Sequence, residues 1–371
     1  MLKHLPTTRL MQTTILLSLF PFAAASSGDR DPAFQQCLSR CALADCDPSQ
    51  PALPFYLRWF GWTCRENCAY ACGHVMTDSV GDGSTIHQFY GKWAFHRLGP
   101  FQEPFSILMS LGNLYVHLRA IKAARHRIHP SNRLRPWLIA LGVVQVNTWV
   151  WSTVFHGRDT PRTERLDYLS ATLTISFTLL YTLLRIFHIL TPVSSTRLLL
   201  PMCALIGGIV LGHFAYLSSF PLGSFPYGYH TLFNVVLGLV HNTLWLLWSL
   251  SFRMRYPSLT LPSLTLSFPR PYPPNDPCDC PAPREASTPA VLVVLTTLAM
   301  SLELWDFAPL FRVFDAHGCW HAATIPLGVA WWRFLLADAI ELEGSLKGQR
   351  GAGVGLPLEK KWAPAAAHQV E

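Results

Sequence analysis

The sequence predicts an all-α membrane protein, in which seven transmembrane helices follow a small disulfide-rich luminal N-terminal domain. Half of the 371 residues are hydrophobic and only 14% are charged, whereas a soluble domain carries about 25% charged residues. Seven apolar segments follow one polar, cysteine-rich segment. Each apolar segment is close to the ~20 residues that a helix needs to cross a bilayer.

The N-terminus has the features of a signal peptide. Lys3 and Arg9 make its start basic, residues 15–22 form a short apolar core, and the small residues 23–27 offer a cleavage site. The apolar core is too short to span a membrane comfortably, which favours a cleaved signal over an uncleaved anchor. An uncleaved anchor is the alternative interpretation.

The segment after the signal peptide is expected to depend on disulfides. Six of the ten cysteines lie close together there: Cys37, Cys41, Cys46, Cys64, Cys68 and Cys72. An even cluster in a small secreted domain predicts an oxidising compartment and three disulfides, whose connectivity the sequence leaves open. The competing interpretation is a zinc knuckle, because the last three cysteines have ligand-like spacing.

Seven spans are predicted, at 101–121, 134–155, 166–187, 198–219, 229–250, 289–306 and 318–338. The first is the weakest, because Glu103 and Arg119 lie near its ends. The predicted organisation is a signal peptide at 1–25, a luminal cysteine-rich domain at 26–98, a seven-helix domain at 99–340 and a cytosolic tail at 341–371. The stretch 257–289, rich in Pro, Ser and Thr, is expected to be a flexible cytosolic loop.

The basic residues predict the orientation of the chain. The loops after the first, third and fifth spans hold most of the loop Lys and Arg residues, namely Lys122, Arg125, Arg127, Arg133, Arg135, Arg185, Arg197, Arg253, Arg255, Arg270 and Arg284. By the positive-inside rule the N-terminus is then luminal and the C-terminus cytosolic, in agreement with the signal peptide. Because these residues recur between apolar spans and form no single patch, the net charge of +7 does not indicate nucleic-acid binding.

Polar groups from three spans are predicted to meet at the luminal leaflet. The second span ends with Ser152 and His156, the third begins with Asp167, and the last begins with His317 and His321. Residues four apart share one face of a helix, so each Ser–His or His–His pair points the same way. Ionisable groups are costly inside a membrane, and they therefore mark functional candidates.

These residues predict a catalytic metal site. His317 and His321, one helical turn apart, can bind one metal, and His156 from another helix supplies a third nitrogen. Three protein ligands leave one position open, which is typical of catalytic zinc. Zinc is therefore the expected cofactor, and it lowers the pKa of bound water to about 7. His213, His230 and His241 lack such partners and are expected to be packing or interfacial residues.

Two further carboxylates have more than one interpretation. Asp159, three residues after His156, competes with Asp167 as the acid and base, or it pairs with Arg158. Glu103, near the luminal end of the first span, either supports the site or is an interfacial carboxylate. The interfacial interpretation is favoured.

Several stretches resemble the signature blocks of the PER-like family, whose animal counterpart is post-GPI attachment to proteins factor 3. They are residues 62–64, 90–93, 101–104, 155–159 and 315–326. This family is similar to the CREST superfamily of seven-helix membrane hydrolases, which includes alkaline ceramidases and adiponectin-type receptors. The superfamily pattern is a Ser four residues before a His, an Asp eleven residues after it and a final H-x3-H, matched here by Ser152, His156, Asp167, His317 and His321.

The resemblance implies remodelling of the lipid of GPI-anchored proteins. The expected reaction is hydrolysis of the sn-2 acyl ester of the GPI lipid, as by a GPI-specific phospholipase A2. GPI-anchored proteins and membrane lipids are then the expected partners. The expected location is the endoplasmic reticulum membrane, or the Golgi, with a luminal active site.

The expected mechanism is metal-assisted ester hydrolysis. His156, His317 and His321 hold zinc, Asp167 accepts and returns a proton, and Ser152 hydrogen-bonds the water or the developing oxyanion. Two other functions stay open. One is a ceramidase-type amidase, and the other is a seven-helix receptor or ion-homeostasis protein with a structural metal.

Overall fold

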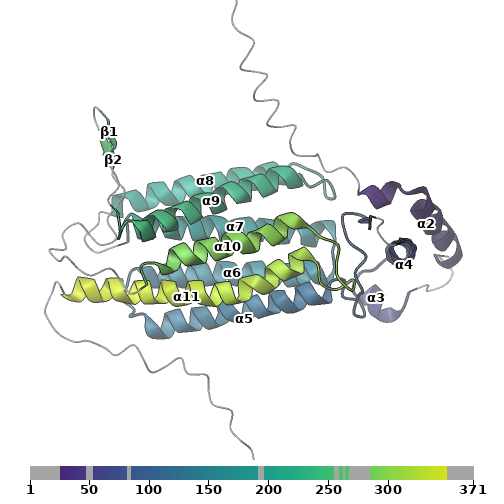
Figure 1. Cartoon of the computed structure of the whole chain (residues 1–371), viewed down its shortest axis with the longest axis horizontal. Helices are drawn as coiled ribbons and strands as arrows, with labels where there is room; N and C mark the ends of the chain where they lie inside the picture. Colours follow the sequence, from purple (N-terminus) through teal and green to yellow (C-terminus); the bar gives the residue numbers. More distant parts are fainter. Residues whose placement is uncertain are drawn as a thin grey trace, which may run out of the picture.

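The computed structural model describes residues 26–46, 53–81, 85–190, 196–254, 259–261, 264–266 and 285–348. The predicted signal peptide lies outside the described residues. Within the described ranges, long helices lie side by side in one bundle, and a smaller helical region lies beyond one end of it (Figure 1). The predicted all-α fold class is confirmed. We call the bundle end next to the smaller region the proximal end, and the opposite end the distal end.

The bundle consists of α5 (Pro104–Arg127), α6 (Leu134–Gly157), α7 (Pro161–Ile186), α8 (Leu199–Ser218), α9 (Tyr227–Leu250), α10 (Thr288–Trp305) and α11 (Ala316–Gly348). Each helix overlaps the predicted span in the same position. Six of them, α6 to α11, are long and apolar enough to cross a membrane. The protein is therefore a multi-pass membrane protein.

Helix α5 is as long as its neighbours but less apolar. Its inward face is polar and buried, and it carries Ser106, Ser110, Asn113 and His117. Its outward face is apolar and exposed, and it carries Leu108, Leu111, Tyr115 and Leu118. The last turn is basic. Because α5 packs between α6 and α11, it is the seventh helix of the bundle, with its polarity directed inward.

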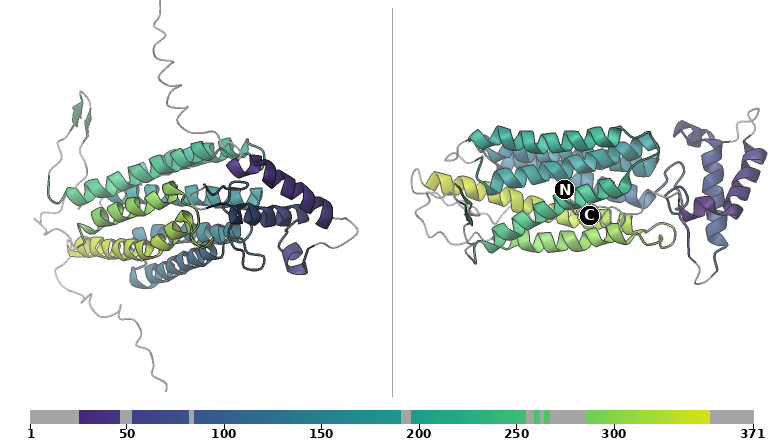
Figure 2. Two further views of the ribbon diagram at one scale, coloured as in Figure 1. Left: turned by 45° about the vertical axis from the view of Figure 1, so that its right-hand side comes forward. Right: turned by 90° about the horizontal axis from the view of Figure 1, so that it is seen from above.

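The helices pack in a closed order. Helices α5, α6, α7, α9, α10 and α11 contact one another in that sequence, α11 returns to α5, and α8 packs against α7. Figure 2 shows the long helices running along a common axis from two directions. The connection between α6 and α7 is short because Thr160 caps α7 in a capping box and Pro161 starts it. The end of α6 and the start of α7 therefore meet at the proximal end.

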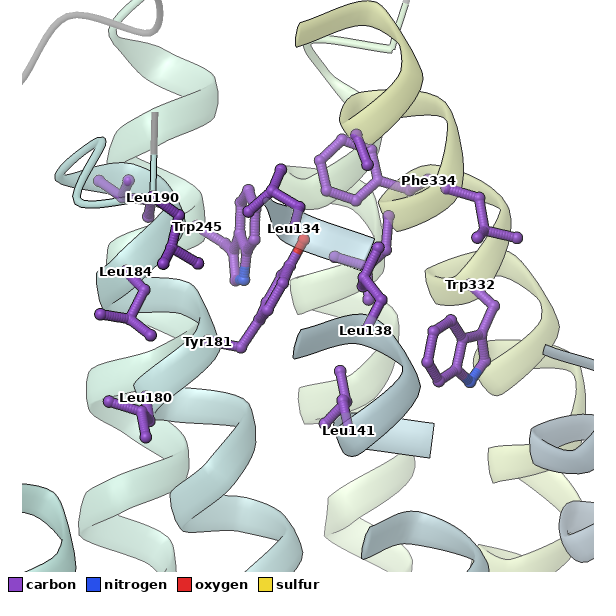
Figure 3. Close-up of a cluster of buried hydrophobic side chains, with 14 of the residues drawn as sticks. Leu134, Leu138, Leu141, Leu180, Tyr181, Leu184, Leu190, Trp245, Trp332 and Phe334 are labelled. Atoms are coloured by element: carbon purple, nitrogen blue, oxygen red, sulfur yellow. The ribbon is translucent and has the colours of Figure 1, made fainter. Parts of the chain in front are cut away.

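The main hydrophobic core fills the distal half of the bundle. Figure 3 shows Leu134, Leu138 and Leu141 of α6 among buried side chains that include Tyr181 of α7 and Phe334 of α11. Inside a membrane, such side chains hold helices together mainly through close van der Waals packing, because lipid is as apolar as the side chains themselves. The proximal half, in contrast, buries polar groups.

The cysteine-rich region contains η1 (Ser27–Arg30), α2 (Pro32–Asp45), α3 (Phe55–Trp59) and α4 (Cys64–Asp78). Three disulfides join α2 and its end to α4: Cys37–Cys72, Cys41–Cys68 and Cys46–Cys64. The predicted three disulfides are confirmed, and their nested order makes α2 and α4 antiparallel. The zinc-knuckle interpretation is wrong, because the sulfurs of Cys64, Cys68 and Cys72 are each bonded to another cysteine of the region and are not available as thiolate ligands.

Two differences from the predicted loops concern the distal side. Within the stretch predicted as a flexible loop, β1 (Leu259–Leu261) pairs antiparallel with β2 (Leu264–Leu266). Each strand is a Leu-Thr-Leu sequence, and β-branched Thr favours extended backbone. Helix α11 also continues to Gly348, beyond the predicted start of the tail, and the rest of that tail lies outside the described residues. A short η2 (Thr196–Leu198) precedes α8.

Candidate active site

Three histidines from two helices form a cluster at the proximal end. His156 lies in the last turn of α6, and His317 and His321 lie in the first turns of α11. One ring nitrogen from each lies within 4.8 Å of the others. His156 and His321 are buried, whereas His317 is partly exposed. The structure thus brings together the three histidines that the sequence predicts as metal ligands.

Two carboxylates orient two of these rings. Nδ1 of His156 lies 2.6 Å from Oε2 of Glu103, and Nδ1 of His317 lies 2.5 Å from Oε2 of Glu303. A metal-binding histidine commonly donates its other ring N–H to a carboxylate, which fixes the tautomer and the ring orientation. In both rings this leaves Nε2 as the nitrogen for a metal.

The third ring is oriented by hydroxyl groups. Nδ1 of His321 lies 3.0 Å from Oγ of Ser110, and the same Oγ lies 3.0 Å from Oγ of Ser152. Asn113 donates a hydrogen bond of 2.8 Å to the backbone oxygen of His321. Ser152 is thus connected to the histidine cluster through Ser110 of α5.

The residues fit a divalent metal ion such as zinc. Nε2 of His156 is buried and has no hydrogen-bond partner among the described residues. An unsatisfied buried polar atom costs about 1–3 kcal/mol, so native structures rarely leave one without a purpose. Three imidazole nitrogens from the protein, with a fourth position for water, are a ligand set of catalytic zinc sites.

Asp167 lies near the start of α7, and it is only 8% exposed. Its carboxylate accepts no hydrogen bond from the described residues. The charged groups that act on it come from all around the cluster: His317, Lys92, Glu303 and Glu103. His317 and Lys92 attract it, and the two glutamates repel it. Asp167 is therefore a buried carboxylate beside the cluster whose oxygens are not committed to a partner.

A lysine from the loop before α5 completes the charge balance. Nζ of Lys92 donates a 2.8 Å hydrogen bond to Oε1 of Glu103 and lies 3.5 Å from Oδ2 of Asp159. Although burial disfavours both charged forms, Lys92 and His156 hold the pKa of Glu103 well below its usual range. Against the same burial, Glu103 and Asp159 hold the pKa of Lys92 well above its usual range. Glu103 is 4% exposed, so the favoured interfacial interpretation is wrong.

The structure shows which charged residue the Asp159 side chain contacts. Its carboxylate faces Lys92. Arg158 instead pairs with Glu66 at 2.7 Å and lies over the ring of Trp62. Arg158 does bond to Asp159, but through a 2.5 Å hydrogen bond to its backbone oxygen and not to its carboxylate. The contacts with Glu66 and Trp62 connect the end of α6 to the cysteine-rich region.

The other intramembrane histidines lie outside the cluster. Nε2 of His213 is 3.3 Å from Nδ1 of His230, and the His213 ring stacks on Phe233. Nδ1 of His241 lies 3.0 Å from Oδ1 of Asn242. These histidines pack within α8 and α9, as the sequence predicts.

Sequence reasoning missed Lys92, Ser110 and Glu303. Glu303 is the only charged residue in α10, and an isolated carboxylate in an apolar span is itself a functional signal. Ser110 belongs to the polar stripe of α5, which has helical spacing. Lys92 lies in a loop outside the described helices, but Lys92 and Glu103 both belong to stretches that resemble signature blocks of the family, and this resemblance could have marked Lys92 as a candidate.

Comparison with known proteins supports the resemblance. The profile of the Per1-like family matches residues 54–339. The chain is 34% identical to "GPI-specific phospholipase A2-like PGAP3" of Mus musculus over 91% of this chain and 95% of the mouse protein. It is 36% identical to "Protein PER1 homolog" of Schizosaccharomyces pombe over 84% of this chain and 86% of that protein. No solved structure matches the chain.

Proposed function

Since this chain belongs to the Per1-like family, we propose that it remodels the lipid of GPI-anchored proteins by hydrolysing the sn-2 acyl ester. The reaction is that of a GPI-specific phospholipase A2. One observation carries the proposal: Nε2 of His156 is buried and unpartnered in a cluster with His317 and His321. A buried carboxylate, Asp167, lies beside the same cluster.

The histidines would hold the metal, and the surrounding residues would orient them. A zinc ion bound by His156, His317 and His321 supplies Lewis-acid polarisation and activates water. Glu103 and Glu303 hold the first two rings through Nδ1. Because these rings are held in place, their nitrogens already point toward a common centre. Less conformational freedom is then lost when a metal binds.

Two residues carry the remaining chemistry. Asp167 takes the proton of the attacking water as that water adds to the ester carbonyl. It then returns the proton to the leaving glycerol oxygen, so that a free fatty acid and a lysolipid are formed. The Ser152 hydroxyl donates a hydrogen bond to the oxygen on which negative charge develops. Because Ser110 donates its own hydrogen to the backbone oxygen of Ser106, Ser152 donates to Oγ of Ser110 in the resting site, and its hydrogen turns toward the substrate oxygen during the reaction.

The depth of the cluster favours an ester of a membrane lipid as the substrate. His156 lies in the last turn of α6, and His317 lies in the first turn of α11. The cluster therefore lies close to where these helices leave the hydrocarbon layer. Glycerolipids carry their acyl esters at this boundary between the hydrocarbon and the headgroups. A lipid in the bilayer can thus present its sn-2 ester without leaving the leaflet.

The test is the composition of GPI lipids in cells that lack the protein. We expect their GPI-anchored proteins to retain an unsaturated sn-2 chain, and reintroduction of the wild-type chain to restore remodelling. Mass spectrometry of the released lipids measures this directly. Normal GPI lipids together with accumulated ceramide would contradict the proposal and favour a ceramidase-type amidase.

We further propose that the proximal end faces the lumen of the endoplasmic reticulum, where GPI-anchored proteins are exposed. A glycosylation tag placed in residues 220–228, between α8 and α9, should be modified. The same tag in residues 260–285 should remain unmodified. The reverse result would place the cluster on the cytosolic side, out of reach of the substrate.

A further inference from the structure

The short helix α3 has one face fixed in the protein and one face exposed. Leu57 is only 1% exposed and packs with Leu53 and Trp62. On the exposed face, Phe55 and Trp59 are 68% and 75% exposed, and their rings pack against each other at 5.8 Å. Tyr56, Arg58 and Phe60 are also exposed. A continuous exposed aromatic surface of this kind marks an interaction site.

Three contacts fix α3 next to the ends of α5 and α6. The indole N–H of Trp62 donates a 2.9 Å hydrogen bond to the backbone oxygen of Pro100. The Phe60 ring packs edge-on against Phe101 at 5.2 Å. Arg158, which follows α6, donates a 3.2 Å hydrogen bond to the backbone oxygen of Gly61. Figure 1 shows α3 just beyond the proximal end, on the side of α5.

The exposed aromatic face continues into the surface that α5 turns outward. Leu98 and Phe101, in the segment that leads into α5, are exposed. Leu108 and Leu111 continue this apolar surface along α5 itself. In a membrane-spanning bundle the outward apolar face of a helix contacts lipid. The surface of α3 is therefore an extension of a lipid-facing surface beyond the end of the span.

We propose that α3 inserts its exposed aromatic side chains into the headgroup–acyl boundary of the leaflet at the proximal end. Aromatic residues are enriched at this boundary, because their rings are apolar and their polar groups can reach water. Arg58, in the same turn, can pair with lipid phosphate. Such an attachment fixes the cysteine-rich region against the membrane surface. The proposal concerns membrane docking, and it does not depend on the reaction at the histidine cluster.

The test uses the full-length protein in lipid nanodiscs. An environment-sensitive fluorescent amino acid is placed at position 59 of α3 or, as the control, at position 43 of α2. Leu43 is a matched position because it is also apolar and 87% exposed, but it belongs to α2, which extends farther from the bundle than α3 (Figure 1). Both substitutions remove an exposed side chain, and intact disulfides on a non-reducing gel verify folding.

We expect the emission from position 59 to shift to shorter wavelength and to be largely quenched by nitroxide-labelled lipids. The emission from position 43 should remain that of a label in water, without quenching. Equal quenching at the two positions would overturn the proposal. A change at position 59 that requires an added GPI-anchored protein would also overturn it, because the face would then bind protein.

A second pair of variants separates insertion from folding. With the label at position 55, Trp59→Phe should keep the quenching, because phenylalanine also enters the boundary. Trp59→Ser should reduce it, because serine removes the apolar ring. Equal quenching in the two variants would show that the aromatic face of α3 does not drive the contact.

Discussion

The two ends of the bundle both bury charged side chains, but they do so differently. At the distal end, Arg185 of α7 and Asp338 of α11 meet through two hydrogen bonds of 2.6 Å. At the proximal end, Lys92, Glu103 and His156 form a chain of contacts that ends at a nitrogen without a protein partner. At the distal pair, both carboxylate oxygens of Asp338 accept a hydrogen bond from Arg185. The proximal chain is open toward the centre of the histidine cluster.

This difference shows what distinguishes a binding site from a structural ion pair. Buried charge alone does not identify function, because a paired and hydrogen-bonded pair such as Arg185–Asp338 is compatible with a purely structural role. The proximal end instead combines an unsatisfied ligand atom with more carboxylates than its lysine can neutralise. A bound cation would satisfy both features.

The largest effect is expected from removal of one histidine of the cluster. His321→Ala leaves two imidazole ligands, which are too few for a stable zinc site. The purified variant should lose stoichiometric zinc and all lipase activity and still insert in the membrane. His241→Ala, which removes a histidine outside the cluster, is the matched control and should keep both. Full zinc occupancy in His321→Ala would show that the cluster is not the ligand set.

Asp167→Asn should abolish most of the chemistry without removing the metal. The substitution keeps the size of the side chain and removes the base, and general acid–base groups contribute about 10²- to 10⁴-fold in rate. We expect a loss of this size in release of the sn-2 chain, with unchanged zinc content. Asp159→Asn is the control, because its carboxylate faces Lys92. Normal remodelling by Asp167→Asn together with loss in Asp159→Asn would exchange the two roles.

The intervals between the predicted site residues were informative because helix geometry is local. Ser152 and His156 are four positions apart, as are His317 and His321. In a helix this spacing places both side chains of a pair on the same face, whatever the rest of the fold. The order and orientation of the spans predict that α6, α7 and α11 bring these residues to the same leaflet, and the family resemblance, which the Per1-like match confirms, adds the five-residue pattern. Contacts of loop residues, such as Lys92 with Glu103, depend on tertiary packing that no short spacing encodes.

For the fold, as for the site, the sequence predicts local features but not all of the tertiary contacts. Apolar length located all seven long helices, and cysteine number predicted three disulfides. The connectivity was not predictable, because parallel and antiparallel arrangements of α2 and α4 both pair cysteines one turn apart. Glu103 and Arg119 make the first span the weakest prediction, and the polar face of α5 that lies between them was not identified from the sequence. This face is the surface through which Ser110 and Asn113 reach His321.

A smaller effect is expected from Glu303→Gln. The glutamine side chain can still accept a hydrogen bond from His317, but it lacks the negative charge with which Glu303 holds the ring in its orientation. Loss of such an outer partner typically costs about 10- to 100-fold in metal affinity or activity. Zinc competition with a chelator should detect the change. Glu285→Gln is the control, because Glu285 lies just before the opposite end of α10. Equal zinc affinities in the two variants would show that Glu303 does not contribute to the metal site.

The smallest effect on activity is expected at the distal ion pair. Asp338→Ala leaves Arg185 buried opposite an apolar side chain, and breaking a buried pair in this way costs about 3–5 kcal/mol. Thermal unfolding in nanodiscs should therefore occur at a lower temperature. The zinc content of the protein that remains folded should be normal. Loss of zinc from the folded fraction would contradict the separation of the two ends.

The double variant Arg185→Met and Asp338→Leu separates charge from packing at the distal end. It replaces both charges with apolar groups of similar volume, so that no uncompensated charge is left in the core. Such replacements are often neutral or stabilising. We expect the stability lost in Asp338→Ala to be recovered, with sn-2 hydrolysis at the wild-type level. A double variant that folds normally but is inactive would show that the ion pair takes part in the reaction. Apolar packing would then have replaced the contribution of the pair to stability but not its contribution to activity.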